Sequence, residues 1–457
     1  MIDGSGGCRK VLRWIAWAGG GALAVSLLGS PVRAERPVAL SLAQAQSVAV
    51  ENNQMLKAAR KGVEAAQAMK LQTLAGHLPT VRLSEGVMRS NDAVNAFGFR
   101  LRQERFTQAD FDVNALNGPS AITNFQTKLE ILQPIFNGGE TIFRRRQASL
   151  GVTAAERDLA RGEDEVRFHT AEAYWGMVLA RASLEAVQQA LETARAHAAA
   201  AEARHKQETA PLSDVLAARV RVAELQEQEI MAANRVRDAA DGLSLIMGLE
   251  AGAAATPADA LALRAVDVDL ETLIARALQA RPDLMASQTR AVAAEKGIGA
   301  ARAAYIPHLN AFAELELDSD NLFKRRGESW MAGAVVTWNV FSGLRSVGAV
   351  RAARAGAAAA DAQADFQKAR VVREVRKATR EVVAARARVE VAEEALRQAD
   401  ERLRMTGLQY QEGLVTAADL LDAETAQTHT RIRKLAALHD LNVGLARLSF
   451  VVGEAVE

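Results

Sequence analysis

The 457-residue sequence contains little cysteine, proline or aromatic side chain, and its charges nearly cancel. It has one cysteine, nine prolines, 5% aromatic residues and a formal net charge of +1. A near-neutral chain has no basic surface of the kind that binds nucleic acid, and 49% hydrophobic residues disfavour disorder. The scarcity of proline leaves room for long helices. The composition therefore favours a folded, helix-rich protein that does not bind nucleic acid.

The residue patterns of catalytic and metal sites are also missing. The seven histidines show no paired metal-ligand spacing, and neither His-Glu-x-x-His nor Gly-x-Ser-x-Gly occurs. Gly297 and Gly299 resemble part of a dinucleotide-binding motif, but no strand precedes them, so helix packing explains them better. We predict that the protein is not an enzyme and has no catalytic residue, metal site or cofactor.

Residues 1–34 are typical of a secretory signal peptide. Basic residues precede an apolar stretch over 14–29, and Val32–Ala34 forms a small-residue cleavage site, so the mature chain would begin near Glu35. The alternative is an uncleaved membrane anchor. Cys8 lies before the apolar stretch and would be removed with it, which disfavours lipidation and leaves no cysteine chemistry. We expect no later apolar run long enough for a transmembrane helix.

Two long stretches have the composition of single helices. Residues 343–412 contain no proline and are rich in Ala, Val, Leu, Arg and Glu, and residues 140–207 are of the same kind. At 1.5 Å per residue, each would make a helix about 100 Å long. A helix of that length needs partner helices of matching reach, as in a coiled coil.

The sequence also contains an internal duplication. Phe136–Gly139 corresponds to Phe341–Leu344 at an offset of about 205, and Ala75–Pro79 corresponds to Ala303–Pro307 at about 228. The change of offset indicates an insertion of about 23 residues in the first copy. The predicted organisation is a signal peptide over 1–34, a first repeat over 35–248, a linker over 249–268 and a second repeat over 269–457.

Shorter helices accompany each long one. Amphipathic stretches run from Leu42 to about Leu74 and from Leu270 to about Ala304, and return helices are predicted over 212–248 and 417–452. Their lengths indicate that two short helices stack end to end beside each long helix, forming a rod of constant thickness.

Four segments alternate apolar and polar residues with the period of a strand, at about 80–91, 124–136, 308–318 and 329–341. Glu85 interrupts the apolar face of the first. Strands of about ten residues suit a membrane-spanning barrel, in which one face meets lipid. Trp330 and Trp338, eight residues apart, would then mark the two membrane interfaces. A water-soluble sheet with one buried face would show the same alternation.

Four strands cannot close a membrane barrel, since the smallest bacterial examples need about eight. If the strands lie in a membrane, several chains must combine, and three would supply twelve strands. The segments 92–123 and 319–328 would then face the outside.

The most specific local pattern is Tyr410-Gln-Glu-Gly-Leu-Val-Thr-Ala-Ala-Asp-Leu-Leu-Asp-Ala-Glu424. It resembles the second helix-turn-helix tip of the outer-membrane efflux protein family, the TolC-like channels. The resemblance covers essentially the whole mature chain, with strand hairpin, long helix, turn and return helix in that order, twice over. It implies a mainly α fold with a transmembrane β-barrel section.

The resemblance further implies a homotrimer with a 12-stranded barrel in outer-membrane lipid and a coiled-coil helical tube through the periplasm. Its partners would be a periplasmic adaptor and an inner-membrane transporter. Such a protein is the exit duct of a tripartite efflux or type I secretion system, and it passes small molecules or proteins passively.

The same resemblance implies which residues form the gate. Asp419 and Asp422 would each form an acidic ring at the narrowest point, although a helix N-terminus explains Asp419 equally well. Tyr410, Ser213 and Asp214 match the positions that link the tips of the closed gate.

Adaptor docking is expected at Ala210, Pro211 and Leu212, extending to Ser213, and at Gly413, Leu414 and Val415, extending to Thr416. Val415 stands where the family has a basic gate partner. The first tip is about one residue shorter than in the family and lacks its turn glycine, so docking can differ between the tips.

A different class of function also fits long helices, namely a soluble periplasmic coiled-coil scaffold or adaptor. Four alternating strands at equivalent points of two repeats disfavour this alternative, because an adaptor would normally carry one helical hairpin flanked by its own β modules.

Overall fold

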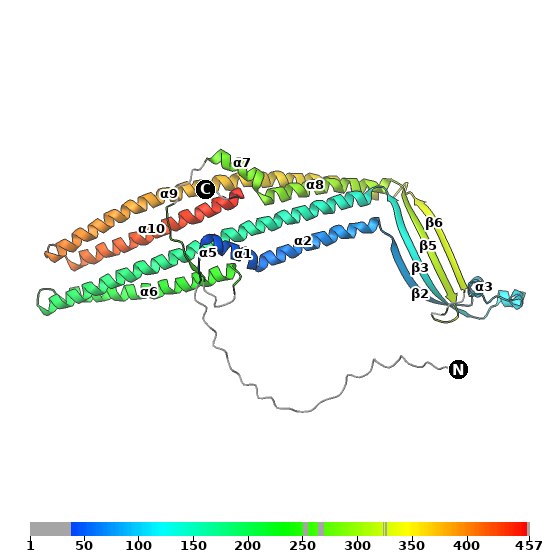
Figure 1. Cartoon of the computed structure of the whole chain (residues 1–457), viewed down its shortest axis with the longest axis horizontal. Coiled ribbons are helices and arrows are strands. Elements are labelled where there is room, and N and C mark those ends of the chain that lie inside the picture. Colours follow the sequence, from blue (N-terminus) through cyan, green and yellow to red (C-terminus); the bar gives the residue numbers. More distant parts are fainter. Residues whose placement is uncertain (1–37, 250–254, 264–268, 323, 325–326, 455–457) are drawn as a thin grey trace, which may run out of the picture. The chain divides into compact units, whose positions relative to one another are not determined.

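The computed structural model describes residues 38–249, 255–263, 269–322, 324 and 327–454. The predicted signal peptide lies outside the described residues. Helices make up most of the described chain, and one four-stranded sheet adjoins them (Figure 1).

Two helices of 67 residues dominate the structure, α5 (Glu140–Lys206) and α9 (Arg345–Gln411). Both are rich in alanine and lack proline, which favours an uninterrupted helix. After a short turn, each is followed by a return helix packed beside it, α6 (Leu212–Ile246) after α5 and α10 (Ala417–Val452) after α9.

Shorter helices pack along the other part of α5 and α9, and they are α1 (Leu42–Asn52), α2 (Gln54–Gln72), α7 (Leu270–Ala280) and α8 (Pro282–Arg302). The sequence predicts one continuous helix on each side where the structure has two. Asn53 breaks the first, because its side-chain oxygen accepts the Met55 N–H at 2.9 Å and starts a new helix. Pro282 breaks the second, because a residue before proline disfavours helical geometry, and Arg281 is extended.

A four-stranded antiparallel sheet has the strand order β2-β3-β5-β6. Its strands are β2 (Thr80–Ser90), β3 (Ile122–Asn137), β5 (His308–Ser319) and β6 (Gly327–Thr337). Short 3-10 turns, η1 (Thr73–Gly76) and η3 (Ala303–Tyr305), connect α2 to β2 and α8 to β5. Strands β2 and β6 are the two edges.

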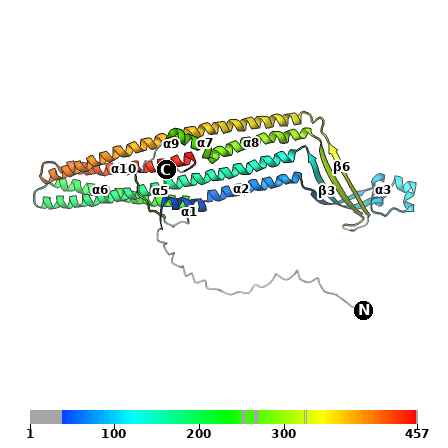
Figure 2. The same cartoon turned by 45° about the horizontal axis from the view of Figure 1, so that its top comes forward.

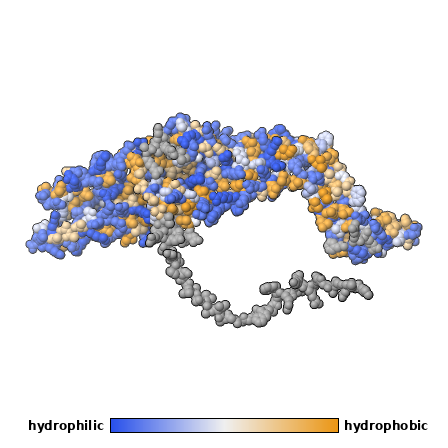
Figure 3. All heavy atoms as spheres, viewed as in Figure 1, coloured by the Kyte–Doolittle hydropathy of each residue, from blue (hydrophilic) through white to orange (hydrophobic). Residues whose placement is uncertain are grey.

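The register places apolar and polar residues on opposite faces of this sheet. One row across the strands contains Leu83, Leu129, Leu315 and Trp330. The preceding residue of β3, Lys128, points to the other face, where its Nζ lies 2.9 Å from Glu314. Hydrophobic residues gather over the strands in the space-filling view (Figure 3).

The last strand ends earlier than predicted. β6 stops at Thr337, whereas the residue pattern predicts a strand as far as residue 341. Thr337 pairs with His308, the first residue of β5, so the ladder has no further partner. Trp338 therefore lies just beyond the strand, where its indole N–H donates to the Tyr305 carbonyl at 3.2 Å.

The segment between β2 and β3, predicted as a loop, contains the helices α3 (Ala93–Arg102), η2 (Gln108–Phe111) and α4 (Val113–Asn117). Gln103, fully buried, ties this segment to the sheet. Its Nε2 donates to the Thr123 carbonyl and to Asn124 Oδ1, both at 2.8 Å.

The predicted linker contributes a short strand. β4 (Ala255–Pro257) pairs in parallel with β1 (Val38–Leu40). The buried Tyr174 on α5 holds both, with its hydroxyl 2.8 Å from the Leu40 carbonyl and from Asp259 Oδ2. Burial raises the pKa of Tyr174 to about 12, so the hydroxyl keeps its proton at neutral pH.

One helix differs in character from the sequence expectation. Among the described residues, α10 is long and apolar enough, by length and composition, to cross a membrane. Its residues Leu441, Leu448 and Val452 are buried in a core shared with α7 and α9. This packing identifies α10 as a core helix.

Candidate channel gate

The two helix-turn-helix tips lie side by side, at the end of the long helices away from the sheet (Figures 1 and 2). We call residues 207–211, between α5 and α6, the first tip, and residues 412–416, between α9 and α10, the second tip. The gate residues predicted from the sequence lie in or near these tips.

The second tip turns at a glycine. Gly413 has φ 72°, a left-handed conformation that glycine adopts without a steric penalty. The Gly413 N–H donates to the Tyr410 carbonyl at 3.2 Å, and the Leu414 N–H donates to the Gln409 carbonyl at 2.9 Å. These bonds satisfy carbonyls that the end of α9 would otherwise leave unpaired.

A capping box starts α10. The Thr416 N–H donates to Asp419 Oδ2 at 2.9 Å, and the Asp419 N–H donates to Thr416 Oγ1 at 3.3 Å. Hydrogen bonds from Thr416 hold the pKa of Asp419 below its usual range. Asp419 therefore stays ionised and has a local structural role, independent of any ring.

Asp422 lies one helical turn beyond Asp419, so both carboxylates project from the same side of α10. Its side chain is exposed, and within the described part of the chain it makes no hydrogen bond or ion pair. A carboxylate that is not engaged locally is available to attract a passing cation.

The first tip has a different local chemistry. Glu208 adopts φ 56°, which is uncommon for a residue with a side chain, and the Thr209 N–H donates to the Arg204 carbonyl at 2.9 Å. Pro211 precedes α6 and provides no side-chain cap. Ser213 Oγ donates to the neighbouring Asp214 Oδ1 at 3.4 Å.

Tyr410, in the last turn of α9, contacts the last turn of α5 in a way that the sequence does not reveal. The guanidinium carbon of Arg204 lies 4.9 Å from the centroid of the Tyr410 ring, close enough for a cation–π interaction. The predicted links between Tyr410, Ser213 and Asp214 stay a prediction. The basic last turn of α5 was the only sequence signal for this contact.

A second pair of side chains, farther along the helices from the tips, joins the same two helical hairpins. His197 Nε2 on α5 lies 2.9 Å from Glu424 Oε1 on α10. The hydrogen bond that the His197 imidazole donates to the Glu424 carboxylate raises the pKa of His197. Because the two residues lie more than 200 positions apart in the sequence, no local pattern could have paired them.

The expected docking surfaces carry exposed apolar side chains. Leu212 at the first tip and Leu414 at the second are both exposed, and Val415 is half-buried. No group of three His, Cys, Asp or Glu side chains is placed to bind a metal in the residues that the structure describes.

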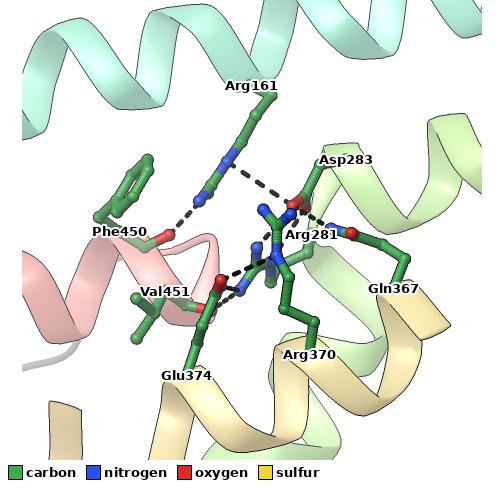
Figure 4. A network of polar contacts seen from close by, with 8 residues as sticks. All are labelled: Arg161, Arg281, Asp283, Gln367, Arg370, Glu374, Phe450 and Val451. Atoms are coloured by element: carbon green, nitrogen blue, oxygen red, sulfur yellow. Dashed lines mark hydrogen bonds and ion pairs between the residues drawn. The ribbon is translucent and has the colours of Figure 1, made fainter. Parts of the chain in front are cut away.

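Further along the molecule, a buried charge network joins α8, α9 and the end of α10 (Figure 4). Arg281 is fully buried; its guanidinium contacts Asp283 at 2.5 Å and Glu374 at 2.7 Å and donates to the Val451 carbonyl at 3.3 Å. Burial alone would lower the pKa of Arg281, but its bonds to the two carboxylates outweigh burial and raise it.

Arg161 brings α5 into the same network. Its Nη1 donates to the Phe450 carbonyl at 2.8 Å, its guanidinium lies 3.6 Å from the centroid of the Phe450 ring, and its Nε lies 4.0 Å from Asp283. The network therefore holds the end of α10 against three other helices.

Comparisons with known proteins give this arrangement a family. The sequence pattern of the outer membrane efflux protein family matches residues 45–249 and 273–454. The chain therefore belongs to that family.

Individual relatives match less extensively. A solvent efflux pump outer membrane protein, SrpC of Pseudomonas putida, is 29% identical over 132 residues, and so is the toluene efflux pump outer membrane protein TtgI of the same species. The matched region spans 28% of this chain and 28% of each relative. The Campylobacter jejuni CmeC outer membrane channel has a similar fold, with a TM-score of 0.77 at 18% identity over 91% of this chain and 86% of that one.

Proposed function

We propose that this chain is a subunit of an outer-membrane exit duct in a tripartite efflux or type I secretion system. Substrates, small molecules or proteins, would pass through it passively while an inner-membrane transporter supplies the energy. The observation that carries the proposal is a sheet with one apolar and one polar face and two open edges, joined to helices about 100 Å long.

The sheet supports a barrel made of several chains. The edge strands β2 and β6 are exposed along most of their length, whereas the central strands β3 and β5 are partly covered. Open edges are not tolerated in a membrane, so each edge must pair with another chain. A homotrimer would give twelve strands, with the apolar face in outer-membrane lipid and the polar face lining the pore.

The proposed organisation follows the duplication. Residues 35–248 and 269–457 would be two copies of one unit, joined by 249–268, after a cleaved signal peptide over 1–34. The equal lengths of α5 and α9 support this division. Trp330, on the apolar face, and Trp338, just beyond β6, are both exposed and would lie at the membrane interfaces.

At the opposite end, the tips would form the periplasmic gate. Asp422, and with it Asp419, would be gathered into rings of carboxylates by the symmetry of the trimer. The exposed Leu212 and Leu414 would contact the periplasmic adaptor.

The assembly is tested by separating inner and outer membranes and measuring the particle mass in mild detergent. A three-chain particle in the outer membrane is the expected result. A soluble periplasmic monomer would overturn the proposal in favour of the scaffold alternative.

The gate is tested by ion selectivity in a planar bilayer. Asp422→Asn and Asp419→Asn each remove a charge, and asparagine at position 419 keeps an acceptor for Thr416. Both variants should lose cation preference, while Asp422→Glu should retain it. Unchanged selectivity in both neutral variants would exclude the acidic rings.

A further inference from the structure

Inside one chain, α5 packs on α8 by fitting bulky side chains over glycines. A methyl group added at Gly299 would lie 2.5 Å from the ring of Phe143, and one added at Gly297 would lie 3.3 Å from Gln147 Nε2. A side chain at position 299 would therefore clash with the Phe143 ring, and one at position 297 would require Gln147 to shift by a few tenths of an ångström. Toward the middle of the helices the contact becomes polar, where Arg161 lies between Asp283 on α8 and Phe450 on α10.

The helices on the two sides of the chain correspond in order and spacing. Adding 205 to a residue number takes the first residue of α5 to the first residue of α9. The same offset takes the first residue of α6 to the first residue of α10. For the shorter helices the offset is 228, which takes the start of α1 to the start of α7 and the start of α2 to the start of α8. In this correspondence α9 matches α5, α2 matches α8 and α6 matches α10. Each contact of α5 with α8 therefore has a matching pair of positions on α9 and α2, and each contact of α5 with α10 has one on α9 and α6.

At the positions that match the glycine contacts, the large and small side chains are exchanged: α9 has the small residue and α2 the large one. Phe143 and Gly299 correspond to Gly348 on α9 and Leu71 on α2. In the same way, Gln147 and Gly297 correspond to Ala352 and Met69.

These counterpart residues have open surroundings in the single chain. Met69 is 63% exposed and Leu71 is 66% exposed. A methyl group added at Gly348 would meet nothing within 4 Å. Here α9 offers the small residues and α2 the large ones, so the two surfaces are complementary.

At the polar contact, the counterpart residues are apolar. Arg161 corresponds to Phe366 on α9, Asp283 to Met55 on α2, and Phe450 to Leu245 on α6. Phe366 is 70% exposed, and Met55 and Leu245 are each 79% exposed. Three large apolar side chains with so little cover indicate an interface.

The face of α9 between these two contacts consists of small residues. Ala355, Ala359 and Ala362 are exposed and continue the spacing of three and four residues from Ala352 to Phe366. Such a stripe is one straight face of a helix, and alanine lets another helix approach closely.

We propose that α9 of one copy packs against α2 and α6 of a second copy. Gly348 and Ala352 receive Leu71 and Met69 of that copy, and its Met55 and Leu245 enclose Phe366. The inference rests on the proposed multi-chain assembly and specifies the surfaces that build it. Because each copy uses two different surfaces, α9 on one side and α2 with α6 on the other, the contact is head-to-tail. Head-to-tail contacts form a closed ring when the rotation from one copy to the next divides a full turn.

Two observations favour a second copy over lipid as the occupant. The charged side chains Arg351, Arg354 and Asp361 are exposed beside the α9 stripe, which lipid would not accept. The sheet also has its open edges on the strands connected to these helices, since β2 follows α2 and β6 precedes α9. The same pairing therefore brings β6 of one copy beside β2 of the next.

Disulfide cross-linking tests the register. The only natural cysteine is Cys8, so introduced pairs are unambiguous once Cys8 is replaced by serine. Ala352→Cys with Met69→Cys should give cross-linked dimers and trimers on oxidation in isolated membranes. Ala352→Cys with Met55→Cys is the matched control, because Met55 lies about 21 Å along α2 from Met69 and should not cross-link.

Charge substitution with rescue tests the apolar contact. Phe366→Arg should raise the ratio of monomer to assembled protein at least about tenfold in mild detergent, because the charge is buried without a partner. Adding Met55→Asp and Leu245→Phe rebuilds between copies the arrangement found inside one chain, and it should restore assembly.

The outcomes separate this inference from the proposed function. If the trimer is intact but the Ala352→Cys, Met69→Cys pair does not cross-link, the assigned surfaces are wrong and the channel proposal stands. The same conclusion follows if Phe366→Arg leaves assembly unchanged. A wild-type protein that is monomeric in the membrane would overturn both.

Discussion

The two tips build the same helix-turn-helix from different local chemistry. The second tip turns at Gly413 with φ 72° and starts α10 with the Thr416–Asp419 capping box. The first tip turns at Glu208 with φ 56° and starts α6 after Pro211, which offers no side-chain acceptor. The second tip therefore satisfies its own backbone, and the first does so incompletely.

The difference shows what holds each turn in place. The first tip relies on side chains from the last turn of α5. His205 Nδ1 lies 2.9 Å from the Ala210 carbonyl, and the Arg204 guanidinium lies over the ring of Tyr410 on α9. We expect the first tip to open locally more often than the second, which hydrogen exchange at the two turns would measure.

The largest effect is expected for Gly413→Ala. A methyl group at Gly413 meets no atom within 4 Å, so its cost is purely conformational, about 1–2 kcal/mol for the left-handed backbone. Hydrogen exchange over residues 408–416 should accelerate accordingly. Gly407→Ala, also with open space but inside α9, is the control and should slow exchange. Equal effects of the two changes would contradict our account of the turn.

Removing the cap comes next. Thr416→Ala loses one half of the capping box and should destabilise the start of α10 by about 1 kcal/mol. Thr416→Ser should be nearly neutral. Pro211 stands at the corresponding cap position of the first tip and has no side-chain acceptor, so Ser213→Ala in the first turn of α6 is the comparison. It should have little effect, since the side-chain hydrogen bond of Ser213 in the described structure goes to its neighbour Asp214. A first-tip change as large as the Thr416 effect would remove the proposed difference between the tips.

A change that stabilises the first tip is expected at Glu208. Glu208→Gly relieves the left-handed strain but adds freedom to the unfolded chain, for a net stabilisation of about 0.5 kcal/mol. Glu208→Gln keeps a side chain on the same left-handed backbone and should change nothing. Slower exchange in both variants would mean that charge, not backbone conformation, limits the stability of this turn.

The smallest effect concerns pH. The raised pKa of His197 means that its pairing with Glu424 is fully present below the unfolded histidine pKa and is lost as pH rises through the folded value. Arg204 opposes the protonation of His197, while Glu424 favours it. After correction for intrinsic exchange, both tips should exchange slightly more slowly at about pH 6 than at about pH 8. His197→Gln should abolish the difference, and His429→Gln should not.

Local sequence information determined much of the fold. The absence of proline over 140–207 and 343–412 favours continuous helices because each residue bonds only its near neighbours. The alternation in the four strand segments likewise follows from the two-residue period of a pleated backbone. Asp419, whose position at a helix N-terminus is predicted from the sequence, likewise acts within one helical turn.

Tertiary structure decided what depends on partners far apart in the chain. The end of β6 at Thr337 was set by where β5 begins, and α3 (Ala93–Arg102) is tied to the sheet by the hydrogen bond of Gln103 to the Thr123 carbonyl. The contacts of Arg281 with Glu374 and of His197 with Glu424 exist because packing brings together side chains that are distant in sequence. A periodic pattern gives the face on which a residue lies, but only the packed helices determine what that face meets.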